Sequence, residues 1–324
     1  MAVRQLCAGI DIGGSAAKIG IVTPDGTIVR EASVPTSAFI SPSELLDSQI
    51  DVIIDWQASL EGRLVALGVG VPGHVTDSHR STDVCNLKCL NGFPIADYIE
   101  QRTGLRVWIE NDADAAGIGE HRFGAGRDSP RFLMATLGSG IGTSFILDGK
   151  ITVTANGTLG DIGHLIVDKQ MRFRCRGGCL GCIESVASGL ALSRDARRLA
   201  AHSPDSYLGC LVQRGKLELT ARDIIDGASE GDRICIDKME DTAHWIGMWA
   251  SSVIQIFGPD TMAFGGGWSA AGQKFIDRIV QHARSMGVPH YFRRLEARQA
   301  ILGNKAGFVG AATYAREMLL ADRI

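Results

Sequence analysis

The sequence has no excess of positive charge and no long uncharged run of apolar residues. Its 324 residues carry a formal net charge of −3, whereas general nucleic-acid binding needs a basic face. No uncharged apolar stretch reaches the roughly 18 residues of a membrane span, and the segment before Asp11 lacks the apolar stretch and cleavage site of a signal peptide. We therefore expect a cytoplasmic protein that binds neither nucleic acid nor membrane.

Two common catalytic motifs are missing as well. The sequence contains neither a G-x-x-x-x-G-K-[ST] phosphate loop nor a G-x-S-x-G nucleophile turn. The run Gly68–Gly73 fits G-x-G-x-x-G, but Pro72 and the polar residues after it stand where a dinucleotide site needs a helix. An anionic ligand must therefore be held by other backbone turns.

Strand-like and helix-like segments alternate along the chain, which is typical of an α/β protein. The length favours two domains. Glycine, charge and proline cluster in HRFGAGRDSP, residues 121–130, where we place the domain boundary. Each half opens with a strand, a glycine-rich turn and a second strand, and this pattern indicates a duplicated architecture.

The two glycine-rich turns are candidates for phosphate binding. The first ends an apolar strand in Asp11, Gly13, Gly14 and Ser15. Glycines let backbone N–H groups approach a ligand closely, and the carboxylate can hold a hydrated Mg²⁺. The second, Gly138–Thr143, offers three glycines and two hydroxyl groups. Either turn alone also fits an ordinary hairpin, but two in matching positions favour a phosphate held between two domains.

Asn111 and Asp112 follow a predicted strand, Arg106–Ile109, and open a predicted helix of small residues, Ala113–Gly119. A carboxylate at the start of a helix can be a plain N-cap. It can also be the general base that takes a proton from a hydroxyl group. The residues alone leave both interpretations open.

The eight cysteines are expected to be reduced thiols or metal ligands. His164 lies eleven residues before Cys175, and Cys179 and Cys182 follow in a glycine-rich loop. Three cysteines and one histidine are a tetrahedral zinc set, and a loop with little core of its own gains order from a metal. The alternative is a group of unmetallated thiols.

The sequence contains a series of segments that resemble the motifs of the ROK family (repressors, open reading frames and sugar kinases), in the same order and over nearly the whole chain. The matching segments are DIGGS at 11–15, GVGVPG at 68–73, Asn86-Leu87, NDADAA at 111–116, LGSGIGT at 137–143, GDIGH at 160–164, GCIESVASG at 181–189 and GGG at 265–267. Within the family, SGLALSRDARRL at 188–199 is most similar to N-acetylmannosamine kinases.

The resemblance implies an α/β fold of two actin-like, ribonuclease-H-like ATPase lobes with a cleft between them. The N-terminal lobe would comprise residues 1–121, joined by a C-terminal helix at about 306–324, and the C-terminal lobe would comprise 122–305 with the zinc loop. Because the family commonly forms dimers, we also expect a homodimer.

The resemblance also implies roles for individual residues. Asp112 corresponds to the catalytic base that takes the proton of the sugar 6-hydroxyl. The expected sugar contacts are Gly73, Asn86, Asn111, Asp161, His164 and Glu184. The expected contacts to ATP and Mg²⁺ are Asp11, Gly13, Gly14, Ser15, Lys18, Gly138, Ser139, Gly140, Gly142, Thr143, Gly265, Gly266 and Gly267. The expected ligands of a structural Zn²⁺ are His164, Cys175, Cys179 and Cys182.

Three positions depart from the family pattern. Asp161 stands where the family has glutamate, Gly177 where it has the middle zinc cysteine, and Asp114 where it has asparagine. The first departure bears on sugar specificity. The second bears on zinc geometry, and we expect Cys179 to replace the missing ligand.

The sequence thus predicts an ATP-dependent kinase of a hexose-type sugar such as glucose or N-acetylmannosamine. One alternative is a ROK repressor, which carries a DNA-binding helical domain before the first strand. Only ten residues precede Asp11 here, so this alternative is disfavoured. The other is a sugar-binding protein without catalysis, which the presence of both Asp11 and Asp112 disfavours.

Overall fold

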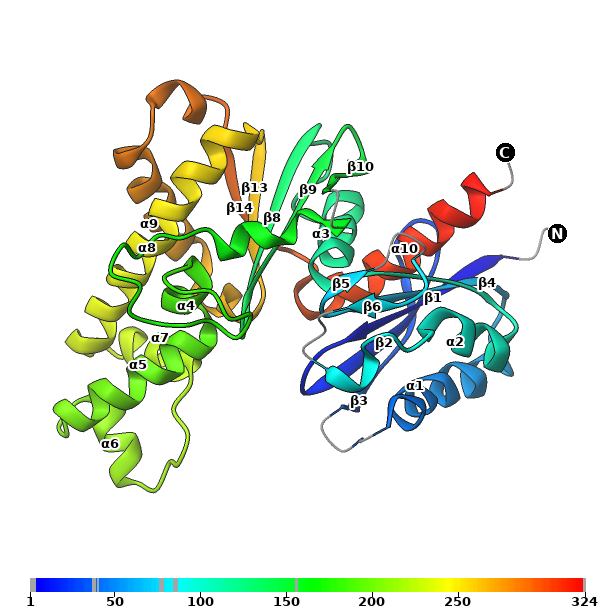
Figure 1. Cartoon of the computed structure of the whole chain (residues 1–324), viewed down its shortest axis with the longest axis horizontal. Coiled ribbons are helices and arrows are strands. Elements are labelled where there is room, and N and C mark those ends of the chain that lie inside the picture. Colours follow the sequence, from blue (N-terminus) through cyan, green and yellow to red (C-terminus); the bar gives the residue numbers. More distant parts are fainter. Residues whose placement is uncertain are drawn as a thin grey trace. The chain divides into compact units, whose positions relative to one another are not determined.

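The chain divides into two compact units (Figure 1). The computed structural model describes residues 4–36, 39, 41–75, 79–83, 87–154 and 157–322, without the side chains of 83, 157–161, 269 and 270. Unit 1 comprises Met1–Pro130, Ser144–Leu159 and Ile301–Ile324, and unit 2 comprises Arg131–Thr143 and Gly160–Ala300. Compared with the expected lobes, residues 122–130 and 144–159 therefore belong with unit 1.

Unit 1 is built on a mixed sheet of five strands in the order β3-β2-β1-β4-β7. Strands β1, β2 and β3 form an antiparallel meander, while β4 and β7 run parallel to β1. Two short strands, β5 and β6, pair beside them. The bounds are β1 (Gln5–Ile12), β2 (Ala16–Val22), β3 (Ile28–Pro35), β4 (Arg63–Val71), β5 (His74–Val75), β6 (Thr82–Asp83) and β7 (Arg106–Asn111).

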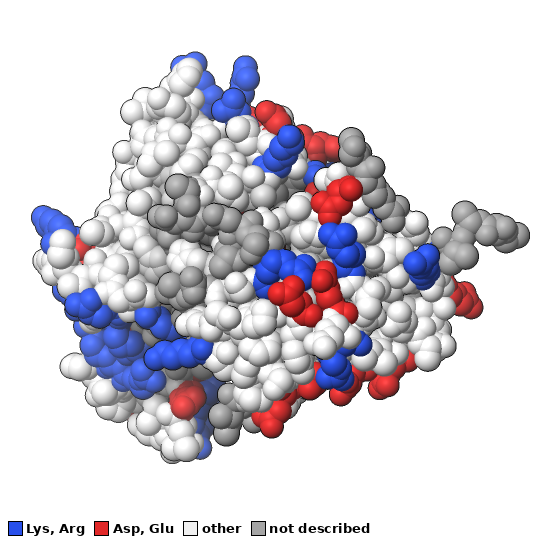
Figure 2. Space-filling view, turned by 45° about the vertical axis from the view of Figure 1, so that its right-hand side comes forward, with Lys and Arg blue, Asp and Glu red and all other residues white. Residues whose placement is uncertain are grey.

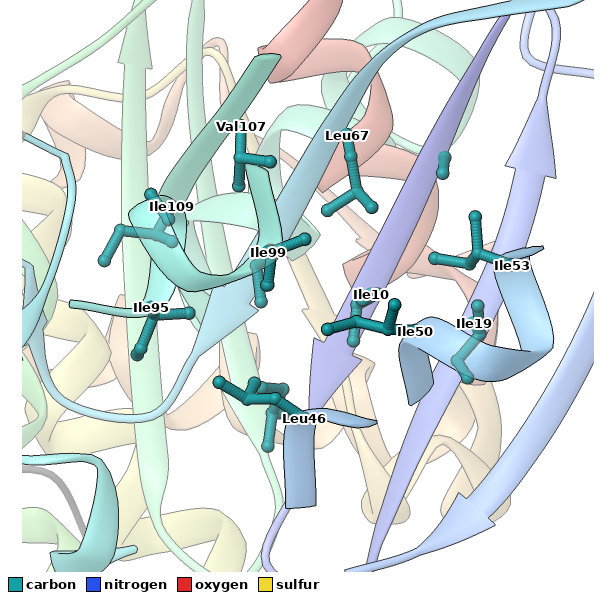
Figure 3. Packing of buried hydrophobic residues seen from close by; sticks show 14 of the residues in the cluster. Ile10, Ile19, Leu46, Ile50, Ile53, Leu67, Ile95, Ile99, Val107 and Ile109 are labelled. Atoms are coloured by element: carbon teal, nitrogen blue, oxygen red, sulfur yellow. The ribbon is translucent and has the colours of Figure 1, made fainter. Parts of the chain in front are cut away.

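Helices α1 (Pro42–Gln57) and α2 (Ile95–Thr103) bury their apolar stripes against this sheet. Helix α1 begins directly after Ser41, whose side chain caps it by accepting a hydrogen bond from the backbone N–H of Glu44. The buried residues of this core are aliphatic. Figure 3 shows Leu46, Ile50 and Ile53 of α1 and Ile95 and Ile99 of α2 with Ile10, Ile19, Leu67, Val107 and Ile109 of the sheet.

Helix α10 (Ala306–Ala321) packs closely on strands β1 and β4, together with α3 (Asp112–Phe123). Glycines on the strands make this approach possible. A Cβ atom at Gly9 or Gly68 would lie 1.9 Å from the carbonyl oxygen of Phe308 or Ala311, respectively. The C-terminal helix therefore belongs to the core of unit 1.

The second sheet has the strand order β10-β9-β8-β13-β14, and its strands β8, β13 and β14 belong to unit 2. Strand β13 runs parallel to β8 and to β14. The hairpin strands at one edge followed by parallel strands repeat the order of the first sheet, as the duplicated pattern predicted. The bounds are β8 (Arg131–Leu137), β9 (Ile141–Leu147), β10 (Lys150–Ile151), β11 (Val153–Thr154), β12 (Gly157–Thr158), β13 (Thr261–Gly265) and β14 (Glu296–Gln299).

The rest of unit 2 is mainly helical. Its longest helix, α8, is capped by Asp232 and ends at Gly258 in the left-handed conformation. The fully buried Trp249 of α8 donates its indole N–H to the carbonyl oxygen of Ile162 at 2.8 Å, which anchors the segment carrying His164. The α-helices are α4 (Ile183–Ala187), α5 (Gly189–His202), α6 (Tyr207–Gln213), α7 (Ala221–Ser229), α8 (Arg233–Phe257) and α9 (Gly272–Met286). The 3₁₀ turns among the residues that the structure describes are η1 (Lys88–Leu90), η2 (Leu159–His164), η3 (Gly267–Ala271), η4 (Pro289–Phe292) and η5 (Gly303–Lys305).

Charge is unevenly distributed over the surface. Figure 2 shows basic side chains gathered at the lower left of the face drawn, with basic and acidic side chains mixed elsewhere. Arg172, Arg174 and Arg176, beside the cysteines of unit 2, are all exposed. Within the described ranges, no helix combines the length and apolar composition of a membrane span.

Candidate active site and metal centre

Asp112 lies at the junction between β7 and α3 in unit 1. The Asn111 side chain caps α3 by accepting hydrogen bonds from the backbone N–H groups of Ala113 (2.9 Å) and Asp114 (3.2 Å). The Asn111 amide also donates to the carbonyl oxygen of Gly73 at 2.9 Å. The cap role that the sequence left open for Asp112 thus belongs to Asn111.

Asp112 is only partly buried, yet its carboxyl group titrates far from its ordinary range. Loss of hydration, and then the negative charge of Asp11, raise the pKa of Asp112 to about 7, while the Ala113 N–H and Lys18 lower it. The Ala113 N–H donates to Asp112 Oδ1 at 2.8 Å. A carboxylate that titrates near neutrality is suited to accept a proton at physiological pH.

The first glycine-rich turn connects β1 to β2, also in unit 1. Asp11 faces Lys18 across this hairpin, with 3.8 Å between the carboxylate and Lys18 Nζ. The Thr36 side chain donates to the carbonyl oxygen of Gly13 at 2.8 Å and fixes the turn from outside. Gly14 is exposed, and no atom lies within 4 Å of the position that its Cβ would take. The turn therefore leaves open space beside a carboxylate and a cation.

Behind Asp112 lies a buried acidic group that the sequence did not reveal. Glu110 and Asp114 are 2% and 0% exposed. His79 Nδ1 lies 3.8 Å from Glu110 Oε2 and 3.2 Å from the Tyr314 hydroxyl. Among these residues only Asp114 stood out in the sequence, as a departure from the family pattern. The contact between His79 and Tyr314 joins positions 235 residues apart, and no local spacing signals it.

The second glycine-rich turn, Gly138–Thr143, connects β8 to β9 and rests on the following helices of unit 2. The Gly189 N–H, at the start of α5, donates to the carbonyl oxygen of Gly138 at 2.8 Å. Glu184 Oε2 accepts a hydrogen bond from the Ile141 N–H at 3.0 Å, and a Cβ at Gly140 would lie 2.5 Å from the same oxygen. Glu184, an expected sugar contact, thus also holds this turn.

The third glycine run, Gly265–Gly267, follows β13 and lies next to the end of β8. Gly265 pairs with Thr136 in the parallel register. Gly266 has a φ of 81°, and its Cβ would lie 2.5 Å from the carbonyl oxygen of Leu137, so this position requires glycine. Two of the glycine motifs predicted to contact the nucleotide therefore lie side by side, at the carboxyl ends of the adjacent parallel strands β8 and β13.

His164, Cys175, Cys179 and Cys182 converge in unit 2, with all four donor atoms within 4.8 Å of one another. His164 Nδ1 lies 3.5, 3.4 and 3.8 Å from the sulfurs of Cys175, Cys179 and Cys182. Tetrahedral bonds of about 2.3 Å to sulfur and 2.0–2.1 Å to nitrogen place the ligand atoms roughly 3.5–3.8 Å apart. The donor set therefore has the size of a zinc site.

Gly177 stands where the family has its middle zinc cysteine, and Cys179 lies two residues further along the chain. A Cβ at Gly177 would lie 3.1 Å from the His164 ring and 3.6 Å from Cys175 Sγ, so this position also faces the donor set. Cys179, two residues later, brings its sulfur to 3.3 Å from that of Cys175. The Cys175 N–H donates to the carbonyl oxygen of Cys179 at 2.9 Å, which closes the loop. The geometry thus includes Cys179 in the donor set.

Two expected sugar contacts fall outside what the structure describes. Asn86 lies in the segment 84–86, and the side chain of Asp161 is among those left out. Gly73 has a φ of 126° and is held by Asn111 through its carbonyl oxygen. Within unit 1, Gly73, Asn111 and Asp112 are therefore brought together.

Comparisons with known proteins show which family the chain belongs to. The sequence model of the ROK family matches residues 7–318. The glucokinase of Halalkalibacterium halodurans is 30% identical over 93% of this chain and 92% of its own length, and that of Streptomyces coelicolor is 31% identical over 96% and 98%. A ROK family glucokinase from Streptomyces griseus, solved in complex with glucose and AMPPNP, superposes with a TM-score of 0.85 at 31% identity, covering 96% of this chain and 99% of that one. Two actin-like lobes are the fold of such ATPases, and the chain belongs to the ROK family.

Proposed function

We propose that the protein is an ATP-dependent kinase that phosphorylates O6 of a hexose-type sugar such as glucose or N-acetylmannosamine. The observation that carries this proposal is Asp112, a carboxylate at the start of α3 with a pKa of about 7. Its place matches the general base of the family. Full-length similarity to glucokinases, one of them solved with glucose and AMPPNP, supports the same reaction.

Asp112 acts as the general base. Its carboxylate accepts the proton of the sugar hydroxyl while that oxygen takes over the phosphoryl group from ATP, so ADP and the sugar phosphate leave with one proton held on Asp112. Such a base contributes about 10²–10⁴-fold to a rate. The remaining sugar hydroxyls are held by Gly73, Asn86, Asn111, Asp161, His164 and Glu184.

The nucleotide is held by the three glycine motifs, and Mg²⁺ by Asp11. The open space at Gly14 and the exposed Ser15 suit phosphate oxygens, since backbone N–H groups can approach them there. Bound Mg²⁺ neutralises charge on the transferring phosphoryl group. The phosphate contacts are Gly13, Gly14, Ser15, Lys18, Gly138, Ser139, Gly140, Gly142 and Thr143, and Gly265, Gly266 and Gly267 face the adenosine.

A structural zinc ion completes unit 2. The spacing of His164, Cys175, Cys179 and Cys182 supports a tetrahedral site. The loop 165–182 has few strands or helices of its own, so a bound metal would supply much of its order. We assign no step of the reaction to this zinc.

We also propose that the protein works in the cytoplasm as a homodimer. The cytoplasm supplies ATP and keeps the thiols of a zinc site reduced. The dimer rests on the family resemblance. Analytical ultracentrifugation of the purified protein measures it directly, and a monomer at micromolar concentration would contradict it.

The proposal is tested by measuring ADP release with a panel of hexoses and N-acetylhexosamines in the presence of Mg²⁺. We expect release that requires both ATP and one or a few of these sugars, with a phosphate monoester at O6 in the product. Sugar binding without ADP release would instead support the non-catalytic or regulatory alternative.

A further inference from the structure

Asp114 has a fully buried carboxyl group whose two oxygens both lack a hydrogen-bond partner within the described structure. It is the third residue of α3, where an acidic side chain ordinarily accepts a hydrogen bond from the backbone N–H of the N-cap residue. Here that N–H, of Asn111, donates instead to Glu110 Oε1 at 2.9 Å. An ionised Asp114 would therefore be buried without a donor, which is costly.

Glu110, four residues before Asp114, also has a buried carboxyl oxygen without a hydrogen-bond donor. Its second oxygen, Oε2, is buried and is likewise unsatisfied by any described residue. His79 lies 3.8 Å away, but its Nδ1 is already within 3.2 Å of the carbonyl oxygen of Ile109 and of the Tyr314 hydroxyl. Glu110 is thus a carboxylate whose Oε1 is satisfied, and whose Oε2 has the Tyr314 hydroxyl and the His79 ring nearby but no hydrogen bond of ordinary geometry.

We propose that Glu110 and Asp114 hold one proton between them, with Asp114 protonated and its hydroxyl directed to Oε2 of an ionised Glu110. A protonated Asp114 supplies the donor that Glu110 lacks, and it removes one of three negative charges from a stretch of five residues. Asp114 is then a positioning residue, which keeps the first turn of α3 intact while Asp112 exchanges its proton. This last role rests on the proposed function of Asp112.

The proton is assigned to Asp114 because the charged form of Glu110 is the better supported one. Burial, and then the charges of Glu110 and Asp112, raise the pKa of Asp114 well above its ordinary value. Burial also raises the pKa of Glu110, but the Asn111 N–H, His79 and Tyr314 oppose that shift. The ionisable groups on the surrounding elements are Arg63 at the start of β4, His79 before β6, Arg106 and Glu110 on β7, Asp112, Glu120, His121 and Arg122 on α3, and Tyr314, Arg316 and Glu317 on α10.

A bound metal ion could satisfy the same oxygens, but the geometry favours the proton. Three or more donors that could share one cation come together at His164 and its cysteines, and no other such group occurs in the described part of the chain. The two explanations differ in whether added cations stabilise the protein.

The test compares the pH dependence of unfolding in the wild type and in Asp114→Asn, whose amide keeps a donor for Glu110. An acid with a raised folded pKa stabilises the fold fully below its unfolded value of about 3.9, and this stability is lost as pH rises toward the folded value. The wild-type unfolding constant should therefore increase, relative to that of Asp114→Asn, by up to about tenfold per pH unit above pH 4. The matched control is Asp51→Asn, an exposed carboxylate of α1 in the same unit, which should follow the wild type.

Parallel curves for wild type and Asp114→Asn would show that Asp114 is ionised in the folded protein and would overturn the proposal. Stabilisation of the wild type, but not of Asp114→Asn, by KCl, NaCl or MgCl₂ against tetramethylammonium chloride at equal ionic strength would also overturn it, in favour of a bound cation. Both readouts are independent of activity. They therefore stand even if Asp112 is not the base.

The kinetic constants provide a second test, because replacing a residue with a merely structural role would leave them unchanged. Asp114→Ala removes the donor and should lower kcat by at least about tenfold, and Asp114→Asn should restore most of it. The apparent pKa of the acidic limb of kcat/KM should stay the same in Asp114→Asn, because a neutral Asp114 adds no charge beside Asp112. A downward shift of a unit or more would reveal an ionised Asp114 and contradict the proposal.

Discussion

Asp112 can act as a base near neutral pH because burial and the charge of Asp11 make its proton harder to lose. We therefore expect kcat/KM to fall as pH drops below about 7, by roughly tenfold per unit, since the protonated carboxyl cannot accept the hydroxyl proton. The sign follows from the raised pKa, which protonates Asp112 already at mildly acidic pH. A profile measured from pH 5 to 9 checks this, and a limb near pH 4 would contradict the assignment.

At the residue scale, the sequence predicted the positions with a local motif and missed those without one. Asn111 and Asp112 follow a strand and open a helix, so their place at the site could be anticipated. Glu110 lies just past the predicted strand and belongs to no motif, and His79 and Tyr314 meet through the fold alone. Which of two adjacent polar residues caps α3 also depended on side-chain geometry, and Asn111 takes that role.

At the scale of elements, the loop 165–182 allows a direct test of whether Cys179 replaces the zinc ligand that is missing at Gly177. We expect the wild type to bind about one zinc ion per chain, and we expect Cys179→Ala to bind none and to have a Tm lower by at least about 4 °C, or ~1–2 kcal/mol. The reason is that three remaining ligands leave the loop without a closed tetrahedral site. Elemental analysis and thermal denaturation measure both effects.

Cys210→Ala in α6 is the matched control, because this cysteine lies outside the donor set. It should keep both the metal and the Tm. Normal zinc content in Cys179→Ala would show that Cys179 is not a ligand.

The packing of α10 on the first sheet depends on glycine. Gly68→Ala should destabilise the protein by at least about 1–3 kcal/mol, the cost of overpacking, because its Cβ would lie 1.9 Å from the carbonyl oxygen of Ala311. Gly70→Ala, on the same strand, meets its nearest atom only at 3.4 Å and should cost clearly less. Chemical denaturation compares the two, and equal losses would show that α10 does not approach the strand so closely.

Most elements could be predicted from hydrophobic patterning, but their ends could not. The start of α1 is an exception, because a serine cap followed by proline, here Ser41 and Pro42, is a local pattern that can be recognised in the sequence. Strand β7 runs two residues beyond the expected Ile109, to Asn111. Helix α3 continues to Phe123, past the expected Gly119, since its packing against α10 overrides the local glycine signal.

At the scale of the whole molecule, Glu120 ties together two distant parts of unit 1. Its fully buried carboxylate accepts hydrogen bonds from the N–H groups of Ala125 (2.8 Å), Ile301 (3.1 Å) and Leu302 (2.7 Å). The chain leaves unit 1 after Pro130, returns to it for Ser144–Leu159 and rejoins it finally at Ile301. One carboxylate therefore fixes the segments on both sides of the long excursion through unit 2.

Glu120→Gln should destabilise unit 1 by about 2–3 kcal/mol, because its amide N–H₂ would face backbone donors and hydrogen bonds to a charged group are lost. Urea denaturation measures the loss. Glu317→Gln, a partly exposed carboxylate paired with Arg122, is the control and should cost less than about 1 kcal/mol. Equal losses of stability in the two variants would show that the hydrogen bonds of Glu120 contribute no more than those of a partly exposed carboxylate.

The division into two units was foreseeable from the restart of the strand–turn–strand pattern, but its limits were not. The glycine-rich segment after His121 appeared to be a boundary, yet residues 122–130 belong to unit 1 through contacts such as that of Ala125 with Glu120. Residues 144–159 likewise belong to unit 1, although they include most of β9 and all of β10, which are strands of the second sheet. Such long-range contacts leave no trace in local composition.

The central claim, that Asp112 is the base of a sugar kinase, is tested most directly by ADP release from Asp112→Asn at saturating ATP and sugar. The amide keeps the size of the side chain but cannot accept the hydroxyl proton, so kcat should fall by about 10²–10⁴-fold, while the Tm and sugar binding stay close to those of the wild type and of Asp51→Asn. An Asp112→Asn variant that retains more than about a tenth of the wild-type kcat would contradict the account.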